Sequence, residues 1–312
     1  MTAPSDFTID PAVAYPELVP LRTALRDGDW PAARRQLTDL PAGTRTSLVQ
    51  MSSGYGSRDL FESAVRADPG DTVAAAMLAN RLVNDAWAVR THKMAREVSR
   101  EQFVRFHELL GEAERVTSDA VAHDDSDPTL WTVRLPIARG LEMGQAEVRR
   151  RYGQVALRDP HHLPAQHEML QQLCPKWGGT LDRMHDFALQ CANAAPEGAQ
   201  NPVLIASAHF EHAATLSGGV HKYLNGREVA DELRQAAQRS VFHPSFRRTV
   251  GWVQAHHFFA FVFGLMGDRA TARRLFETTG NLVSETPWYY LGDPLTVYRE
   301  HRERAMRKRR WW

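Results

Sequence analysis

The distribution of apolar and polar residues along the chain indicates helices almost throughout, and the alternating pattern of strands is nearly absent. No Asn-Gly pair separates two alternating apolar runs, as it does in a β-hairpin. Start signals predict helices of about 10 to 20 residues. The most apolar segment, residues 258–266, is predicted to be a buried helix. The predicted helices begin near Tyr15, Trp30, Arg58, Thr72, Ser99, Thr129, Gln145, Leu163, Thr180, Pro202, Gly226, Pro244, Asp268 and Asp293.

Asp-Pro pairs separate many of the predicted helices. The aspartate offers an oxygen that caps the free amides of a helix start, and proline fits the first helical turn. Proline also disfavours helical backbone in the residue before it. We therefore expect each pair to end one helix and begin the next within two residues. The pairs are Asp68-Pro69, Asp127-Pro128, Asp159-Pro160 and Asp293-Pro294.

Two segments near opposite ends of the chain are nearly the same. Residues 28–37 and 267–276 share Gly-Asp, three residues, Ala-Arg-Arg, one residue and a bulky apolar residue. The glycine suits the end of one helix, and the aspartate caps the start of the next. Ala33 and Ala272 are then expected where a small side chain lets two paired helices approach closely. Such internal similarity indicates a repeat architecture.

A second similarity lies just before the Asp-Pro pairs. Residues 64–69 resemble residues 155–160, and residues 120–128 are a looser version. Together with the Gly-Asp turns, these segments resemble tetratricopeptide-type repeats. The distance from Pro128 to Pro160 is close to the repeat length of about 34 residues, whereas the longer distance from Pro69 to Pro128 requires an insertion or longer helices. The alternative is an irregular helical bundle with two chance turns.

The resemblance implies an all-α fold, a TPR-like α-solenoid in which antiparallel helix pairs with irregular repeats form a right-handed superhelix. We expect an N-terminal extension in residues 1–14, the helical-repeat domain in residues 15–298 and a basic tail in residues 299–312. A solenoid of this kind presents a long concave surface.

The segment Cys-Pro-Lys-Trp-Gly-Gly at residues 174–179 carries a second resemblance. It is similar to a Pro-Lys/Arg-Trp-Gly-Gly segment of uncharacterised bacterial helical-repeat proteins, and this similarity implies no activity. Because glycine lets a backbone approach a ligand closely, the turn is a candidate binding loop with Lys176 and Trp177. Alternatively, the glycines end a helix and Trp177 fills a gap between repeats.

The chain contains 14 histidines, and several are close together in sequence. His209 and His212 are three residues apart on a predicted helix, so they share a face. A metal site can be built from such pairs, with His161, His162 and His167 as further candidates. The zinc-protease motif is absent, because a glutamine follows His167 where that motif requires a second histidine. The alternative is that these histidines are partly buried and hydrogen-bonded between helices.

Composition excludes several other classes of site. The formal net charge is +1 in a chain of 312 residues, so no overall field attracts nucleic acid. Two cysteines form neither a disulfide framework nor a four-thiolate zinc site. The sequence contains neither a phosphate-binding loop motif nor a Gly-x-Ser-x-Gly nucleophile elbow. We expect no cofactor.

The C-terminal residues are strongly basic, with seven Lys or Arg and two Glu in residues 299–312. Arg309, Arg310, Trp311 and Trp312 combine cationic groups with indole rings. This combination suits an anionic membrane surface or a nucleic acid. The alternative is a solvated helix end, because basic side chains favour a helix C-terminus.

We expect a soluble, cytoplasmic, bacterial protein. Residues 1–10 have neither the basic start nor the apolar core of a secretory signal. The longest strongly apolar run is far shorter than the roughly 20 residues that span a bilayer. The alanine- and arginine-rich composition is typical of a GC-rich genome.

The resemblance to tetratricopeptide-type repeats implies a scaffold or adaptor that binds a protein or peptide on the concave face of a helical-repeat array, rather than an enzyme. The candidate binding residues are Lys176, Trp177, His209 and His212. The alternative is an enzyme, or a metal- or haem-binding protein, that uses the histidine-rich middle segment of the same scaffold.

Overall fold

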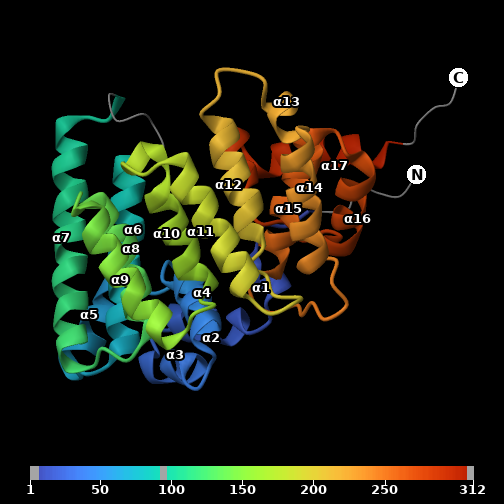
Figure 1. Ribbon diagram of the computed structural model, residues 1–312. Helices are drawn as coiled ribbons and strands as arrows, with labels where there is room; N and C mark the ends of the chain where they lie inside the picture. The colour runs from blue at the N-terminus through green and yellow to red at the C-terminus, as the bar shows by residue number, and fades with distance from the viewer. Residues whose placement is uncertain (1–6, 92–96, 308–312) are drawn as a thin grey trace, which may run out of the picture. The chain divides into compact units, whose positions relative to one another are not determined.

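The computed structural model describes residues 7–91 and 97–307, and within these residues the chain is all-helical (Figure 1). The described residues form 17 α-helices and no strand, and Thr8 and Leu282 form an isolated parallel β-bridge. The predicted all-α fold class is confirmed. The superhelical arrangement of the helix pairs stays a prediction.

The contacts between residues divide the chain into two compact units. The N-terminal unit is Glu17–Gly179, and the C-terminal unit combines Met1–Pro16 with Thr180–Trp312. The N-terminal unit contains α2 (Leu18–Arg26), α3 (Trp30–Leu37), α4 (Ala42–Ser52), α5 (Arg58–Ala67), α6 (Thr72–Arg90), α7 (Arg100–His123), α8 (Pro128–Gly140), α9 (Gly144–Arg158), α10 (Leu163–Leu173) and the 3-10 turn η2 (Pro175–Trp177). The C-terminal unit contains α1 (Pro11–Ala14), α11 (Leu181–Ala194), α12 (Val203–Ala214), α13 (Val220–Leu224), α14 (Arg227–Arg239), α15 (Trp252–Met266), α16 (Arg269–Thr279), the 3-10 turn η3 (Trp288–Leu291) and α17 (Pro294–Met306).

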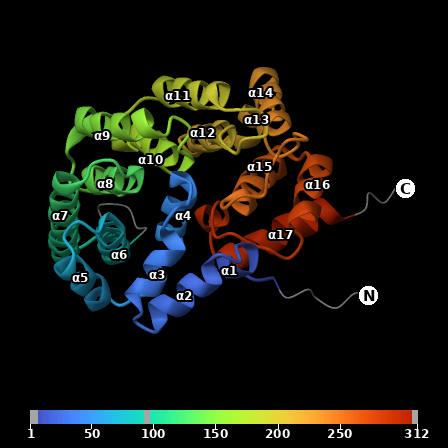
Figure 2. The same ribbon diagram turned by 90° about the horizontal axis from the view of Figure 1, so that it is seen from below.

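In the N-terminal unit, consecutive helices from α5 to α10 pack against one another, and α8 also packs against both α6 and α10. The helices α6 and α8 are buried on nearly all sides, with α5, α7 and α9 outside them (Figure 2). Helix α4 packs against α6, α8 and α10. Its Arg45 pairs with Asp127 at 2.9 Å, and its Thr46 contacts Thr129 at 2.9 Å and His162 at 3.0 Å. These bonds fix α4 on the inner side of the helix pairs.

In the C-terminal unit, α12 and α15 form the buried centre. Helices α11, α13 and α14 pack around α12, while α16 and α17 pack against α15. Residues 258–263, four of which are phenylalanines, are all buried, so the helix predicted there is confirmed. Trp288 is fully buried between Phe261, Phe276 and Tyr298, and each of these rings contacts it.

The two Gly-Asp turns have the same backbone geometry. Gly28 and Gly267 have left-handed φ angles of +73° and +78°. The following aspartate amides donate to Ala24 and Phe263, at 2.9 Å in both turns. Each aspartate side chain caps the next helix, and the following Ala33 and Ala272 are fully buried. The predicted turn, cap and close helix approach are therefore confirmed at both places.

The Asp-Pro pairs behave in two ways. Asp127 and Asp293 cap α8 and α17, and the next residue is the proline of the first turn, as predicted. The prediction is wrong for Asp68 and Asp159, because these residues end α5 and α9 in extended backbone. The next helix begins only three residues after each proline, where Asp71 and His162 supply the caps.

Most predicted helix starts lie within two or three residues of the observed ones. The start near Pro244 is wrong: α15 begins at Trp252, directly after Gly251 with φ +95°. Gln200 donates to the carbonyl oxygens of Thr249 and Val250 at 3.3 and 3.4 Å, so the side chain of another segment supports the non-helical backbone there. Helices α1, α4 and α13 were not predicted.

Candidate functional site

Five polar side chains from four helices of the C-terminal unit meet beside α12, and we call them the histidine cluster. His209 and His212 lie on α12, three residues apart on one face as the spacing predicted. Three residues without a sequence signal of their own complete the cluster: His185 on α11, Tyr223 on α13 and Glu232 on α14. Helices α11, α13 and α14 all pack against α12 (Figure 1).

The cluster forms a continuous chain of short polar contacts. Glu232 Oε2 lies 2.7 Å from His209 Nε2, and His209 Nδ1 lies 2.8 Å from the Tyr223 hydroxyl. The same hydroxyl lies 2.8 Å from His212 Nδ1, which in turn lies 3.0 Å from His185 Nε2. The imidazole rings of His185 and His209 are 4.7 Å apart between centroids. Each side chain is therefore positioned by its neighbour in the chain.

The surroundings disfavour protonation of two imidazoles of the cluster, His185 and His212. Burial, together with the neighbouring His209 and His212, lowers the pKa of His185 to about 4. Burial and His209 also lower the pKa of His212. The hydrogen bond from His209 lowers the pKa of Glu232, so that carboxylate stays ionised. Burial raises the pKa of Tyr223, whose hydroxyl stays protonated.

The predicted metal candidates are placed in both units. His209 and His212 belong to the histidine cluster, whereas His161, His162 and His167 lie around the start of α10 in the N-terminal unit. His162 is buried and its Nδ1 accepts from the Ala165 amide at 3.3 Å, which makes it a helix cap. Burial lowers the pKa of His167 to about 4. Among residues 7–91 and 97–307, no three His, Cys, Asp or Glu side chains are arranged to hold a metal ion.

The predicted loop at Lys176 and Trp177 is the turn η2, which packs within the N-terminal unit. The indole of Trp177 lies edge-on to Trp87 at 6.0 Å, and the guanidinium of Arg139 lies 5.7 Å from its ring centre. Lys176 is exposed. These contacts explain Trp177 by packing, as the alternative expected, while binding through this loop stays a prediction.

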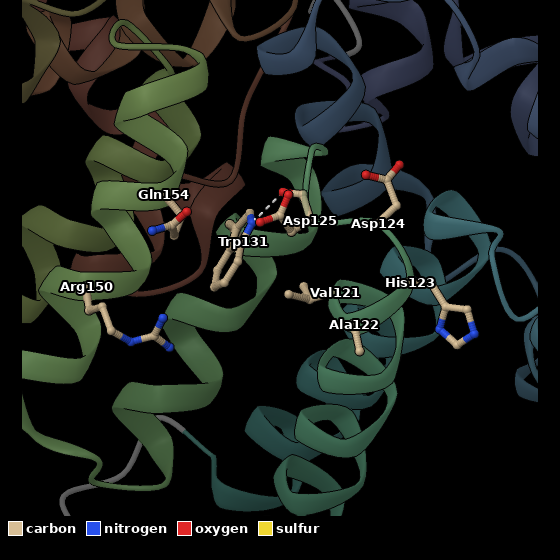
Figure 3. A pocket seen from close by; sticks show the side chains of 8 residues that line it. All are labelled: Val121, Ala122, His123, Asp124, Asp125, Trp131, Arg150 and Gln154. Atoms are coloured by element: carbon tan, nitrogen blue, oxygen red, sulfur yellow. Dashed lines mark hydrogen bonds between the residues drawn. The ribbon is translucent and has the colours of Figure 1, made fainter.

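An open pocket of about 520 Å³ lies on the surface of the N-terminal unit, where α7 ends and α8 and α9 pass beside it (Figure 3). No sequence motif pointed to it. The indole of Trp131 is held in place because its Nε1 donates to the Asp125 carbonyl at 2.8 Å, the bond drawn in Figure 3. The lining residues are Val121, Ala122, His123, Asp124, Asp125, Trp131, Arg150 and Gln154.

The pocket presents both signs of charge beside one aromatic ring. Asp125 pairs with Arg158 at 2.9 Å, and hydrogen bonds from Ser126 lower the pKa of Asp124, which therefore remains ionised. Arg150 forms two hydrogen bonds of 2.8 Å to Glu147, which fix its guanidinium near Trp131. The pocket wall is thus pre-organised by ion pairs and hydrogen bonds.

A largely buried ion network joins the helices that carry the pocket. Glu114 on α7 accepts from Arg134 at 2.7 Å and from Arg151 at 2.8 Å. The Arg134 guanidinium also lies 5.2 Å from the centre of the Trp131 ring. The two guanidinium groups hold the pKa of Glu114 below its usual value despite the opposing effect of burial. These ion pairs therefore fix helices α7, α8 and α9 to one another.

The predicted tail contacts Arg309, Arg310, Trp311 and Trp312 lie outside the described residues, which end at Arg307. Residues 299–306 of the expected tail belong to α17. None of the helices in the described part of the chain is both long and apolar enough to cross a membrane.

Comparison with known proteins identifies no relative: no family model matches the chain, and no curated protein matches it.

Proposed function

We propose that this protein is a binding scaffold for a peptide or protein partner, and that the open pocket over α7, α8 and α9 is part of its binding surface. The observation that carries the proposal is the pocket itself, an accessible concavity of about 520 Å³ on a rigid stack of helices. Binding sites are typically concave and combine an apolar or aromatic wall with a few placed polar groups. Trp131, Asp124 and Arg150 supply these elements here.

In the N-terminal unit, the packing of α4 favours the pocket surface over the inner side of the helix pairs, which α4 covers. A helical-repeat array commonly binds its partner on the concave side of its inner helices. Here α4 packs against α6, α8 and α10 and is held by Arg45 and Thr46. The pocket is built from the end of α7 and from α8 and α9, so a partner reaches it without displacing α4.

The chemistry of the pocket points to a peptide segment with polar side chains. Ionised Asp124 accepts hydrogen bonds, while Gln154 offers its amide donors because Arg158 donates to its Oε1 at 3.0 Å. A volume of about 520 Å³ accommodates one or two side chains of an extended segment.

The test uses two matched alanines that are both exposed near the end of a helix in the N-terminal unit. Ala122 lines the pocket, and Ala67 lies at the end of α5 outside it. Peptides are selected from a display library on the full-length protein, and their affinities are measured by fluorescence polarisation. We expect Ala122→Trp, which places an indole ring in the pocket, to weaken binding at least tenfold.

Ala67→Trp is expected to leave the affinity unchanged, because it adds the same side chain elsewhere on the surface. Equal affinities for both variants, or a library that yields no binder, would overturn the assignment of the pocket. Circular dichroism and thermal unfolding of both variants confirm that each remains folded.

A further inference from the structure

One side of the pocket is formed by the C-terminal end of α7, a helix of 24 residues. Val121, Ala122 and His123 from its last turn line the pocket. Their carbonyl oxygens accept no hydrogen bond from the described part of the chain, because the backbone leaves the helix at Asp124. Free carbonyl groups at a helix C-terminus carry partial negative charge and favour a cation nearby.

The charged side chains at the pocket leave one carboxylate without a cationic partner. The Arg150 guanidinium forms two hydrogen bonds of 2.8 Å to Glu147, and Arg158 pairs with Asp125 at 2.9 Å. Asp124 also lines the pocket, and it forms no ion pair with any of the residues that the structure describes. The unpaired charge at the pocket is therefore negative, like the end of α7 beside it.

The pocket also offers apolar surface next to these negative groups. In Figure 3, Trp131 and Arg150 lie on one side and the end of α7 lies on the other. Lysine and arginine bury their aliphatic stems along apolar surface while the charged head stays in a polar environment. Trp131 and Val121 supply such a surface here. An anionic side chain would instead meet the carboxylate of Asp124 and the carbonyl oxygens of α7.

We propose that the pocket receives a lysine or arginine side chain of the partner peptide. Its aliphatic stem lies against Trp131 and Val121, and its cationic head lies near Asp124 and the free carbonyl oxygens of α7. This assignment rests on the proposed function and adds to it the chemical class of the side chain that the pocket recognises.

The chain offers a closely matched control for Asp124. Asp68 and Asp124 end α5 and α7 in nearly the same backbone, at φ −141° and −148°. Each carboxylate accepts a hydrogen bond from the amide two residues further on, Gly70 at 3.0 Å and Ser126 at 2.8 Å. Asp68 lies outside the pocket. Asparagine keeps an acceptor oxygen at both positions, so Asp124→Asn and Asp68→Asn each remove only the charge.

The test uses peptides selected from a display library on the full-length protein at pH 7.5. We expect one position of the selected peptides to be enriched in lysine or arginine. The tightest peptide is then compared with a version in which norleucine, which has a similar stem and no charge, replaces that residue. Fluorescence polarisation gives the affinities of both peptides for the wild type and for the two asparagine variants.

We expect norleucine in the peptide, or Asp124→Asn in the protein, to weaken binding about fivefold, as for a partly exposed ion pair. The norleucine peptide should bind Asp124→Asn and the wild type equally, because the charge that Asp124 recognises is then absent. Asp68→Asn should bind both peptides as the wild type does.

The outcomes separate this inference from the proposed function. Selected peptides that Ala122→Trp weakens, but that contain no enriched lysine or arginine, overturn the cationic assignment and leave the pocket as the binding site. Equal effects of Asp124→Asn on the two peptides also overturn it. A library without binders, or binders that Ala122→Trp does not weaken, would overturn both proposals.

Discussion

Single residues in this protein show how close packing restricts substitution. Gly179 follows η2, and a Cβ at this position would overlap the backbone carbonyl of Leu173. Gly153 lies inside α9, and a Cβ there would meet nothing within 4 Å. Gly179 is therefore required by close packing, whereas Gly153 is replaceable. The sequence alone does not distinguish these two cases.

We expect Gly179→Ala to lower the free energy of unfolding by about 1–3 kcal/mol, because the backbone between α10 and η2 must shift to relieve the overlap. Gly153→Ala should raise it by about 0.5–1 kcal/mol, since alanine is the better helix former. Chemical denaturation measures both. A Gly179→Ala variant as stable as the wild type would mean that the turn adapts without cost.

At the same scale, the sequence revealed only part of the histidine cluster. The prediction that His209 and His212 share one face of a helix is correct, because their proximity follows from helix periodicity alone. His185, Tyr223 and Glu232 reach the cluster from three other helices, so their positions depend on tertiary packing. The pocket at Trp131 was missed for the same reason, because its lining comes from α7, α8, α9 and the segment between α7 and α8.

Helices and their ends follow more closely from local chemistry. Asp68, Asp124 and Asp159 end three helices with nearly the same backbone, at φ −141°, −148° and −145°. Their sequence similarity therefore corresponds to a shared local structure. Helix α4 escaped prediction because it begins with Ala-Gly-Thr after Pro41 and has no side-chain cap. Its position is determined instead by contacts with α6, α8 and α10.

Asp71 is the N-cap of α6, and its carboxylate also binds side chains of α3. Its carboxylate accepts from two backbone amides of α6, each at 3.1 Å, and from Trp30 Nε1 at 3.0 Å. Arg34 also donates to it at 2.9 Å. Asp71 therefore caps α6 and ties α3 to it at the same time.

We expect Asp71→Ala to lower the free energy of unfolding by about 2–4 kcal/mol, because it removes a cap and leaves the buried Trp30 N–H without an acceptor. Asp268→Ala is the control, since Asp268 caps only its own helix through Thr271. That variant should lose about 1 kcal/mol. Equal losses, measured by urea denaturation, would show that the bonds to α3 contribute nothing.

On the scale of the whole molecule, both units contain imidazoles that burial keeps neutral. The pKa is lowered to about 4 for His167, His185 and His256, and to about 3 for His257. In every case burial is the largest cause. His257 shows why such a group is stable only when neutral: Trp288 Nε1 donates to its Nδ1 at 3.3 Å, and its Nε2 lies 3.2 Å from Thr279 Oγ1.

These shifts predict that the folded protein loses stability as pH falls, well before most carboxylates are protonated. An unfolded histidine titrates near 6.5, so between pH 6.5 and 4 the unfolded chain binds more protons than the folded one. The stabilising contribution of the neutral form is therefore complete above pH 6.5 and decreases below it. His257 alone should contribute a loss of about 2 kcal/mol between pH 7.5 and 5.0.

The substitution His257→Gln isolates this contribution, because glutamine offers a donor and an acceptor and does not titrate. Urea denaturation of wild type and variant at pH 7.5 and 5.0 gives four free energies, and the difference between the two pH values is the quantity that matters. We expect this difference to be smaller in the variant by about 2 kcal/mol, even if the variant is less stable at both pH values. His221→Asn, at an exposed histidine, should leave the difference unchanged. An undiminished pH effect in His257→Gln would show that the other buried imidazoles and the histidine cluster account for the acid sensitivity without His257.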